Sequence, residues 1–249
     1  MDGNGRWAEE RGMVRTKGHE AGVDSVRAIT RECARLGVQS LTLYAFSVEN
    51  WKRPRTEVAQ LMRYLQRFLI EERAEIEQNR IRLSAIGRIA DLPRSVRREL
   101  ARTQELSAKN EGMLLRLALS YGGRTEIVDA VRRIAEDVRS GRITPEKINE
   151  ATIREMLYDP LTPDPDLLIR TAGEMRLSNF LLWQCSYSEL YVTEICWPEF
   201  REPQLHAAFE SYSRRVRKFG AVKPSRSLGL GEALLHPLRA ARRALGGES

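Results

Sequence analysis

The run Met113-Leu-Leu-Arg-Leu-Ala-Leu119 contains one polar residue in seven positions. Such a short apolar run is typical of a strand that is buried on both faces. Four further runs rich in aliphatic and aromatic residues share this character: 41–46 (LTLYAF), 81–86 (IRLSAI), 166–170 (DLLIR) and 189–195 (ELYVTEI). The sequence therefore predicts five strands.

Apolar residues recur at helical spacing between these strands and after the last one. They predict helices over 26–36, 58–69, 127–138 and 205–219, and Gly37 is placed to end the first of them. Strands that alternate with helices predict an α/β fold with a mostly parallel central sheet flanked by helices. Because no long linker rich in Pro, Gly or Ser interrupts the alternation, we expect a single domain.

The chain has 249 residues, of which 42% are hydrophobic and 30% charged, and this apolar content is enough for a sizeable core. No run of about 18 apolar residues is present, and the polar first residues do not form a signal peptide. The three cysteines, Cys33, Cys185 and Cys196, are widely spaced in apolar surroundings. We expect them to be buried, reduced thiols in a cytoplasmic protein.

The net charge of +7 and the pI of about 9.6 are compatible with binding to nucleic acid, to an anionic membrane or to an anionic small substrate. Residues 221–249 hold five basic and two acidic residues and so carry +3 of this charge. No basic helix with interleaved aromatic residues occurs, which argues against nucleic acid. We expect 221–249 to be a basic, disordered tail; the alternative is a short amphipathic segment that rests on anionic membrane.

The segment Arg170-Thr-Ala-Gly-Glu-Met-Arg176-Leu-Ser178 is suited to hold a phosphate group. It places two arginines six residues apart, with Gly173 between them and a hydroxyl two residues further on. The planar guanidinium group offers a fork of donors that matches phosphate oxygens.

A second segment, Met1-Asp2-Gly-Asn-Gly5-Arg6-Trp7, combines a carboxylate, two glycines and an arginine. Glycines let backbone N–H groups approach an anion closely, and a neighbouring carboxylate can hold Mg²⁺ against it. Ser47, Tyr121 and Thr171 each follow the end of a predicted strand, and such ends converge on one cleft in an open α/β sheet. Together these segments predict diphosphate chemistry.

Several motifs resemble those of the cis-prenyltransferases, and the closest type is undecaprenyl diphosphate synthase. The resemblance is collinear from Met1 to about Gly220 and rests on these segments: MDGNGRW (1–7), Gly18-His19, Leu43-Tyr-Ala-Phe-Ser-Val-Glu-Asn-Trp-Lys-Arg-Pro54, Tyr121-Gly-Gly-Arg124, Ser178-Asn-Phe-Leu-Leu-Trp-Gln184 and Glu189-Leu-Tyr. It implies a catalytic domain over 1–220, followed by the tail.

The resemblance implies an enzyme that condenses isopentenyl diphosphate with an allylic diphosphate, such as farnesyl diphosphate. The product would be a cis-polyprenyl diphosphate, undecaprenyl diphosphate for the cell-wall lipid carrier. It also implies Mg²⁺ as cofactor, a homodimer, and work in the cytoplasm with peripheral contact at the inner membrane face. The alternatives are a short-chain cis-prenyl diphosphate synthase and a non-catalytic partner subunit.

The resemblance further implies roles for single residues. Asp2 and Asn50 would be catalytic, and Asp2 and Glu189 would hold the metal ion. The proton acceptor stays open between a substrate phosphate, Asp2, Asn50 and His19. The residues implied to bind substrate are Gly3, Asn4, Gly5, Arg6, Trp7, Arg15, His19, Ser47, Glu49, Trp51, Arg53, Arg170, Arg176 and Ser178.

Three details of this sequence bear on those roles. The family commonly has glycine where Ala172 stands, and an alanine with positive φ there costs about 1 kcal/mol. Ala45, on a strand that faces the product tunnel in the family, is small enough to leave chain elongation unblocked. The family usually places an apolar strand before the motif that begins here at Asp2, so the sequence shows five strands where the family has six. We expect a truncated start rather than a missing strand.

Overall fold

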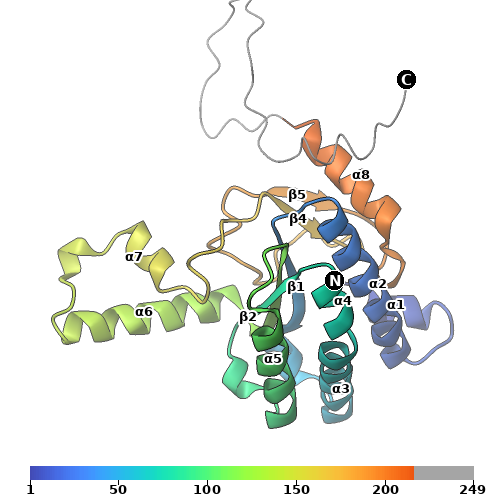
Figure 1. Cartoon of the computed structure of the whole chain (residues 1–249), viewed down its shortest axis with the longest axis horizontal. Helices are drawn as coiled ribbons and strands as arrows, with labels where there is room; N and C mark the ends of the chain where they lie inside the picture. Colours follow the sequence, from blue (N-terminus) through green and yellow to red (C-terminus); the bar gives the residue numbers. More distant parts are fainter. Residues whose placement is uncertain (216–249) are drawn as a thin grey trace, which may run out of the picture.

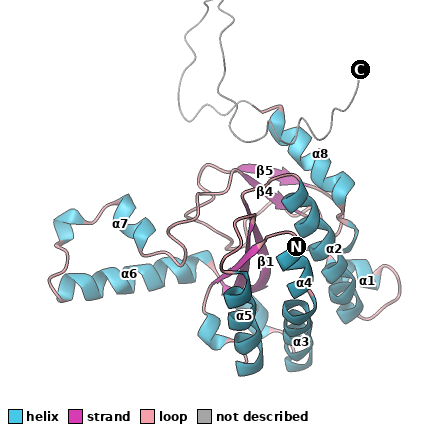
Figure 2. Cartoon of the chain, in the orientation of Figure 1, coloured by secondary structure: helices cyan, strands magenta, loops and turns pink. Residues whose placement is uncertain are grey.

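The computed structural model describes residues 1–215, and it alternates helices with short strands (Figures 1 and 2). The helices are α1 (Asn4–Glu9), α2 (Arg15–Arg35), α3 (Arg55–Glu71), α4 (Arg73–Gln78), α5 (Arg94–Ser107), α6 (Gly123–Arg139), α7 (Glu150–Glu155) and α8 (Glu202–Ser213). The strands are β1 (Ser40–Ser47), β2 (Arg82–Ile86), β3 (Leu114–Tyr121), β4 (Leu167–Arg170) and β5 (Glu189–Val192). Short 3₁₀ turns cover Val48–Lys52, Ile89–Asp91, Pro145–Lys147 and Trp197–Glu199.

All five predicted strands form, and every strand pair is parallel, as the α/β prediction requires. They divide into a three-stranded sheet of order β1-β3-β2 and a two-stranded sheet of β4 and β5. One sheet was expected from the sequence, but β1 and β4 share no ladder. Consecutive residues of both strands instead line one cavity, which separates the two sheets.

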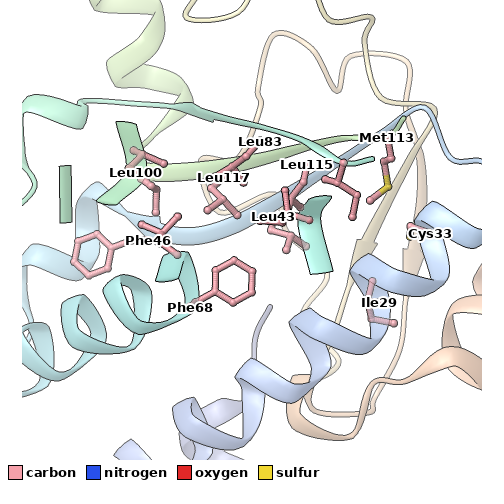
Figure 3. Packing of buried hydrophobic residues seen from close by; sticks show 14 of the residues in the cluster. Ile29, Cys33, Leu43, Phe46, Phe68, Leu83, Leu100, Met113, Leu115 and Leu117 are labelled. Atoms are coloured by element: carbon pink, nitrogen blue, oxygen red, sulfur yellow. The ribbon is translucent and has the colours of Figure 1, made fainter. Parts of the chain in front are cut away.

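The main core lies between the three-stranded sheet and helices α2, α3 and α5. Leu43 of β1 and Leu115 and Leu117 of β3 point toward the helices that carry Ile29 and Phe68 (Figure 3). Residues 115–121 of β3 are all buried, as expected for a central parallel strand. Each large apolar side chain removed from water here contributes about 1.5–3 kcal/mol.

The predicted helices are present with shifted ends. The first prediction, 26–36, is the second half of α2, and Gly37 ends this helix with a φ of 73°. The last helix ends at Ser213, before the predicted end at 219, and 216–249 with the predicted tail lie outside the described residues.

The opposite face of the three-stranded sheet carries a smaller cluster rich in aromatic rings. Tyr44 stacks on Phe180 with ring centroids 4.6 Å apart, and Tyr121 meets both rings edge-on. Helices α6 and α7 extend to one side of the molecule (Figure 1). None of the helices within residues 1–215 combines the length and apolarity needed to cross a membrane.

The three cysteines are buried and unpaired, as predicted. Burial raises the pKa of the Cys33 thiol to about 12, so this thiol stays protonated at neutral pH. It behaves as a small apolar group of the core rather than as a nucleophile.

Candidate active site

A cavity of about 1390 Å³ opens beside the carboxyl ends of β1 and β4. Its lining changes character along its length. Charged and polar groups line one part: Asp2, Asn4, Arg6, Arg15, His19, Ser47, Glu49, Asn50, Arg53, Arg170, Arg176 and Ser178. Apolar side chains from α2, α3, β1 and α8 line another: Val26, Ile29, Leu41, Leu43, Ala45, Leu61, Met62, Leu65, Phe68 and Phe209. The cavity can therefore hold a molecule with a charged head and an apolar tail.

The first residues of the chain are held by main-chain bonds to distant segments. The hydroxyl of Thr171 accepts a hydrogen bond from the Asp2 N–H at 2.8 Å and donates one to the Asp2 carbonyl at 2.9 Å. The same carbonyl accepts a hydrogen bond from the Trp197 N–H at 2.9 Å. Gly3 follows with a φ of 94°, and a Cβ there would lie 2.7 Å from the sulfur of Cys196. Only glycine fits this turn, which leads directly into α1.

The carboxylate of Asp2 pairs with Arg170 at the cavity wall. The Nε and Nη2 atoms of Arg170 lie 3.0 and 2.9 Å from Asp2 Oδ2. The third nitrogen, Nη1, is buried and makes no hydrogen bond within residues 1–215. A buried donor of this kind is costly unless a partner arrives, so Arg170 is prepared to receive an anionic ligand.

The Arg170–Ser178 segment forms a tight turn beside α1. Ala172 and Gly173 both have positive φ, 65° and 70°, so the alanine does occupy the strained conformation considered from the sequence. The side chain of Arg6 donates to the Ala172 carbonyl at 3.0 Å and to Glu174 at 3.2 Å. Glu174 also pairs with Arg176, so one carboxylate holds the two arginines near each other.

Two more predicted arginines border the cavity, Arg15 at the start of α2 and Arg53 just before α3. Arg15 pairs with Glu9 at 2.7 Å and packs over Gly5, where a Cβ would lie 2.6 Å from its guanidinium carbon. Arg53 pairs with Glu57 at 2.9 Å, and the same carboxylate lies 3.5 Å from His19 Nε2. Burial and then the charge of Arg53 lower the pKa of His19, although Glu57 opposes them. The ring is therefore neutral at pH 7.

Residues 47–52, here named the 47–52 turn, follow β1. Asn50 Oδ1 accepts the Ser47 N–H at 3.1 Å and so closes the turn. Glu49 accepts a bond of 2.9 Å from the side chain of Asn179, which also lines the cavity. Sequence reasoning did not select Asn179, although it lies directly after Ser178 in a quoted motif.

Three predicted site residues do not line the cavity: Trp7, Trp51 and Glu189. Trp7 Nε1 donates to Glu199 at 3.1 Å, and Trp51 Nε1 donates to Ser120 at 2.9 Å while its ring packs edge-on against Phe46. These contacts give both tryptophans packing roles that hold the neighbouring motifs in place.

Glu189 is not brought to Asp2 within this chain. It is the first residue of β5 and is in register with Leu167, three residues before Arg170, or roughly 10 Å along the strand. Its carboxylate pairs with Arg215 at 2.7 Å. Residues 1–215 contain no group of three or more Asp, Glu, His or Cys side chains placed to hold a metal ion. Asp2 nevertheless offers a half-exposed carboxylate whose Oδ1 accepts no bond from these residues, which suits an ion held jointly with substrate oxygens.

The comparisons with known proteins agree with this geometry. Residues 1–220 match the family model described as "Putative undecaprenyl diphosphate synthase". An isoprenyl transferase of Clostridium perfringens is 48% identical over 90% of this chain and 88% of its own length, and one of Geobacter sulfurreducens is 48% identical over 88% and 89%.

Two solved structures are similar in fold and sequence. Lavandulyl diphosphate synthase from Lavandula x intermedia, solved with dimethylallyl diphosphate, has a TM-score of 0.86 and 41% identity over 88% of this chain and 95% of that one. A "probable undecaprenyl diphosphate synthase" of Campylobacter jejuni has a TM-score of 0.71 and 34% identity over 81% and 92%. The chain therefore belongs to the undecaprenyl diphosphate synthase family and is a prenyl-condensing enzyme of the cis-prenyltransferase type.

Proposed function

We propose that this enzyme adds isopentenyl diphosphate repeatedly to farnesyl diphosphate and releases undecaprenyl diphosphate, the lipid carrier of cell-wall synthesis. One observation carries the proposal: a single cavity joins an arginine-rich part to a long apolar part. Its volume of about 1390 Å³ exceeds the roughly 300–1,000 Å³ of ordinary small-molecule pockets, which supports a long-chain product.

The two diphosphate heads are assigned to two groups of residues. Arg170, Arg176 and Ser178 bind isopentenyl diphosphate, and the unpaired Nη1 of Arg170 supports this role. The turn Gly3–Arg6 binds the allylic diphosphate together with Arg15, His19 and Arg53, all of which line the same cavity. Fixing both heads orients the reacting carbons and removes much of the entropy cost of bringing them together.

Asp2 is the proposed anchor for Mg²⁺, because its carboxylate is half-exposed beside the arginines. When bound, Mg²⁺ would neutralise charge on the departing allylic diphosphate. Since Glu189 lies away from Asp2 in this chain, Asp2 and substrate oxygens would hold the ion.

The arginines stabilise the negative charge that develops as the allylic C1–O bond breaks. The double bond of isopentenyl diphosphate then forms the new C–C bond, and a proton leaves to give the cis double bond. The acceptor of this proton is a substrate phosphate, Asp2, Asn50 or His19. His19 can serve as an acceptor because its lowered pKa keeps the ring neutral.

A short-chain product is the second candidate, and the similarity to lavandulyl diphosphate synthase favours it. That enzyme was solved with dimethylallyl diphosphate, a five-carbon allylic substrate. Membership of the family further supports a homodimer that works in the cytoplasm and delivers its lipid product at the inner face of the membrane.

The test is incorporation of labelled isopentenyl diphosphate into lipid, with farnesyl or dimethylallyl diphosphate as primer. The expected result is magnesium-dependent incorporation with farnesyl diphosphate and a product of eleven isoprene units by chromatography. Products of two or three units would establish the second candidate instead. No incorporation with either primer would refute both.

A further inference from the structure

The glycine pair after β3 has no assigned role in the proposed chemistry, and its surroundings explain why glycine stands there. A Cβ on Gly122 would lie 2.6 Å from Nδ2 of Asn179, and one on Gly123 would lie 2.8 Å from Leu182. The pair therefore lets the segment that begins at Ser178 pack directly against the start of α6. Asn179 lies at the centre of this contact.

Asn179 uses its main chain and both ends of its side-chain amide. Its carbonyl accepts the Gly123 N–H at 2.7 Å, and Oδ1 accepts the Arg124 N–H at 2.8 Å. Because a backbone N–H can only donate, the oxygen of the amide must face Arg124 and the NH₂ group must face Glu49. Nδ2 does donate to Glu49 at 2.9 Å, across 130 residues of sequence.

The backbone of this segment is also unusual. Ser178 and Asn179 have φ values of 46° and 64°, in the left-handed region that few side chains tolerate. Asn is one of those that adopt it most readily. The same residue thus permits the turn that carries Ser178 and ties this turn to the segment that follows β1.

We propose that Asn179 is a positioning residue for the condensation, which fixes Ser178 at a set separation from the 47–52 turn. This inference rests on the proposed function, because that function assigns Ser178 to isopentenyl diphosphate and names Asn50, the neighbour of Glu49, among the proton acceptors. The bond between the amide and Glu49 holds the isopentenyl diphosphate site in register with the 47–52 turn. The direction of the bond is fixed by Arg124, so the bond can be reversed in a controlled way.

The experiment is a double-mutant cycle on kcat/KM for isopentenyl diphosphate, with variants Asn179→Asp, Glu49→Gln and both together. Asp tolerates the left-handed backbone and keeps the oxygen that accepts the Arg124 N–H, but it sets a carboxylate against Glu49. In the double variant the amide of residue 49 donates and the carboxylate of residue 179 accepts, which restores the bond. We expect Asn179→Asp to lower kcat/KM about tenfold, the worth of one hydrogen bond to a charged group.

The cycle yields a coupling factor, which is the loss of kcat/KM that Asn179→Asp causes in the wild type divided by the loss that it causes in the Glu49→Gln background. A coupling factor above about threefold, with the double variant more active than Asn179→Asp, supports the proposal. A factor within about threefold of unity overturns it. Asn149→Asp is the matched control, because Asn149 also accepts a backbone N–H, from Thr152 at 3.1 Å, but caps α7 outside the cavity lining.

A second variant, Gly122→Ala, tests the same bond with Asn179 intact. The added methyl group displaces Nδ2 and should lower kcat/KM about as much as Asn179→Asp does. If Gly122→Ala leaves kcat/KM unchanged, the proposal is overturned, even if Asn179→Asp fails to fold. A wild-type chain that incorporates no isopentenyl unit would refute the proposed function and this inference together. An active wild type without coupling would refute only the inference.

Discussion

At the scale of single residues, Asp2 is held in place by its main chain rather than by its carboxylate. Its N–H and carbonyl bond to Thr171 and Trp197, while its side chain contacts Arg170 and stays half-exposed. The carboxylate is thus available for a metal ion without being needed to hold the segment. Substitution of this side chain should therefore remove the chemistry while the segment stays folded.

We predict that Asp2→Ala lowers kcat by about 100-fold or more, close to 3 kcal/mol of transition-state stabilisation. The binding of isopentenyl diphosphate, measured by calorimetry, should change little, because the main-chain bonds remain. The melting temperature should fall as it does for Arg170→Ala, because the buried Arg170 loses the partner of its Nε and Nη2 atoms. Asp24→Ala is the control, since its exposed carboxylate on α2 pairs, within residues 1–215, only with Arg27. A near-normal kcat for Asp2→Ala would refute the role of this carboxylate.

Arg170 and Arg176 should respond differently to truncation. Arg176 is 65% exposed, so Arg176→Ala should raise KM for isopentenyl diphosphate roughly ten- to hundredfold with little loss of stability. Arg170 is 10% exposed, so Arg170→Ala should raise KM similarly and also cost about 1–3 kcal/mol in urea unfolding.

The control for this pair is Arg142→Ala, because Arg142 is similarly exposed and pairs with Asp137 near the end of α6. Its KM should equal that of the wild type. If both Arg170→Ala and Arg176→Ala also keep the wild-type KM, the segment does not bind this substrate.

At the scale of elements, helix α8 is joined to α2 by charged groups in addition to apolar contacts. Glu32 of α2 bonds Arg35 on its own helix and contacts His206 of α8. The bond from Arg35, followed by that from His206, outweighs burial and lowers the pKa of Glu32 to about 2. A carboxylate with a lowered pKa stabilises the fold wherever it is ionised.

This stabilisation should be present above the ordinary pKa of about 4.5 and be lost as the pH falls from there to about 2. The shift sets a ceiling of roughly 3 kcal/mol, and screening at the half-exposed Arg35 reduces the expected value to about 1–2 kcal/mol. Glu32→Gln should therefore lose this amount at pH 7 and nothing near pH 2 in urea unfolding. The exposed Glu105→Gln should show no such difference, and parallel curves for Glu32→Gln and the wild type would contradict the assignment.

Elements were predictable from the sequence where apolar residues alone define them. Each strand begins and ends within three residues of its prediction, because aliphatic runs mark strands directly. Helix α5 was not predicted, since its buried face continues from Val96 and Leu100 into Thr103, whose hydroxyl donates to the Leu69 carbonyl. A polar residue that is buried through a tertiary hydrogen bond gives no periodic signal.

Site residues whose role depends on a tertiary hydrogen bond were likewise not predictable from the sequence. Residues that carry charge or glycine in the motifs were identified, and most of them line the cavity. Asn179 was overlooked because its importance depends on Glu49 and Arg124, distant in sequence. Glu189 was placed with Asp2 by resemblance, whereas the register of β4 and β5 sets it three residues away from Arg170.

At the scale of the whole molecule, the cavity lies between two sheets rather than within one element. Strand β1, strand β4 and helices α2, α3 and α8 each contribute to its walls. Its capacity is therefore set jointly by the side chains that reach into it from all of them. Ala45 of β1 is the smallest side chain among the apolar lining residues named above.

We predict that Ala45→Leu shortens the main product by one or more isoprene units, because the larger side chain occupies space that the growing chain would fill. Chromatography of the labelled products measures this change. Ala101→Leu on the exposed face of α5 is the matched control and should leave the product length unchanged. An unchanged product from Ala45→Leu would show that the growing chain does not pass this residue.

The bonds that hold Asp2 also decide when the active site can form during protein synthesis. Asp2 is made before its partners Thr171 and Trp197, which come about 170 and 195 residues later. At about 5–20 residues per second, the ribosome needs roughly 10–40 s to supply them. The nascent segment around Asp2 must therefore wait for almost the whole described chain before its carboxylate is in place. A translation product that stops before Trp197 should be inactive even if its three-stranded sheet has formed.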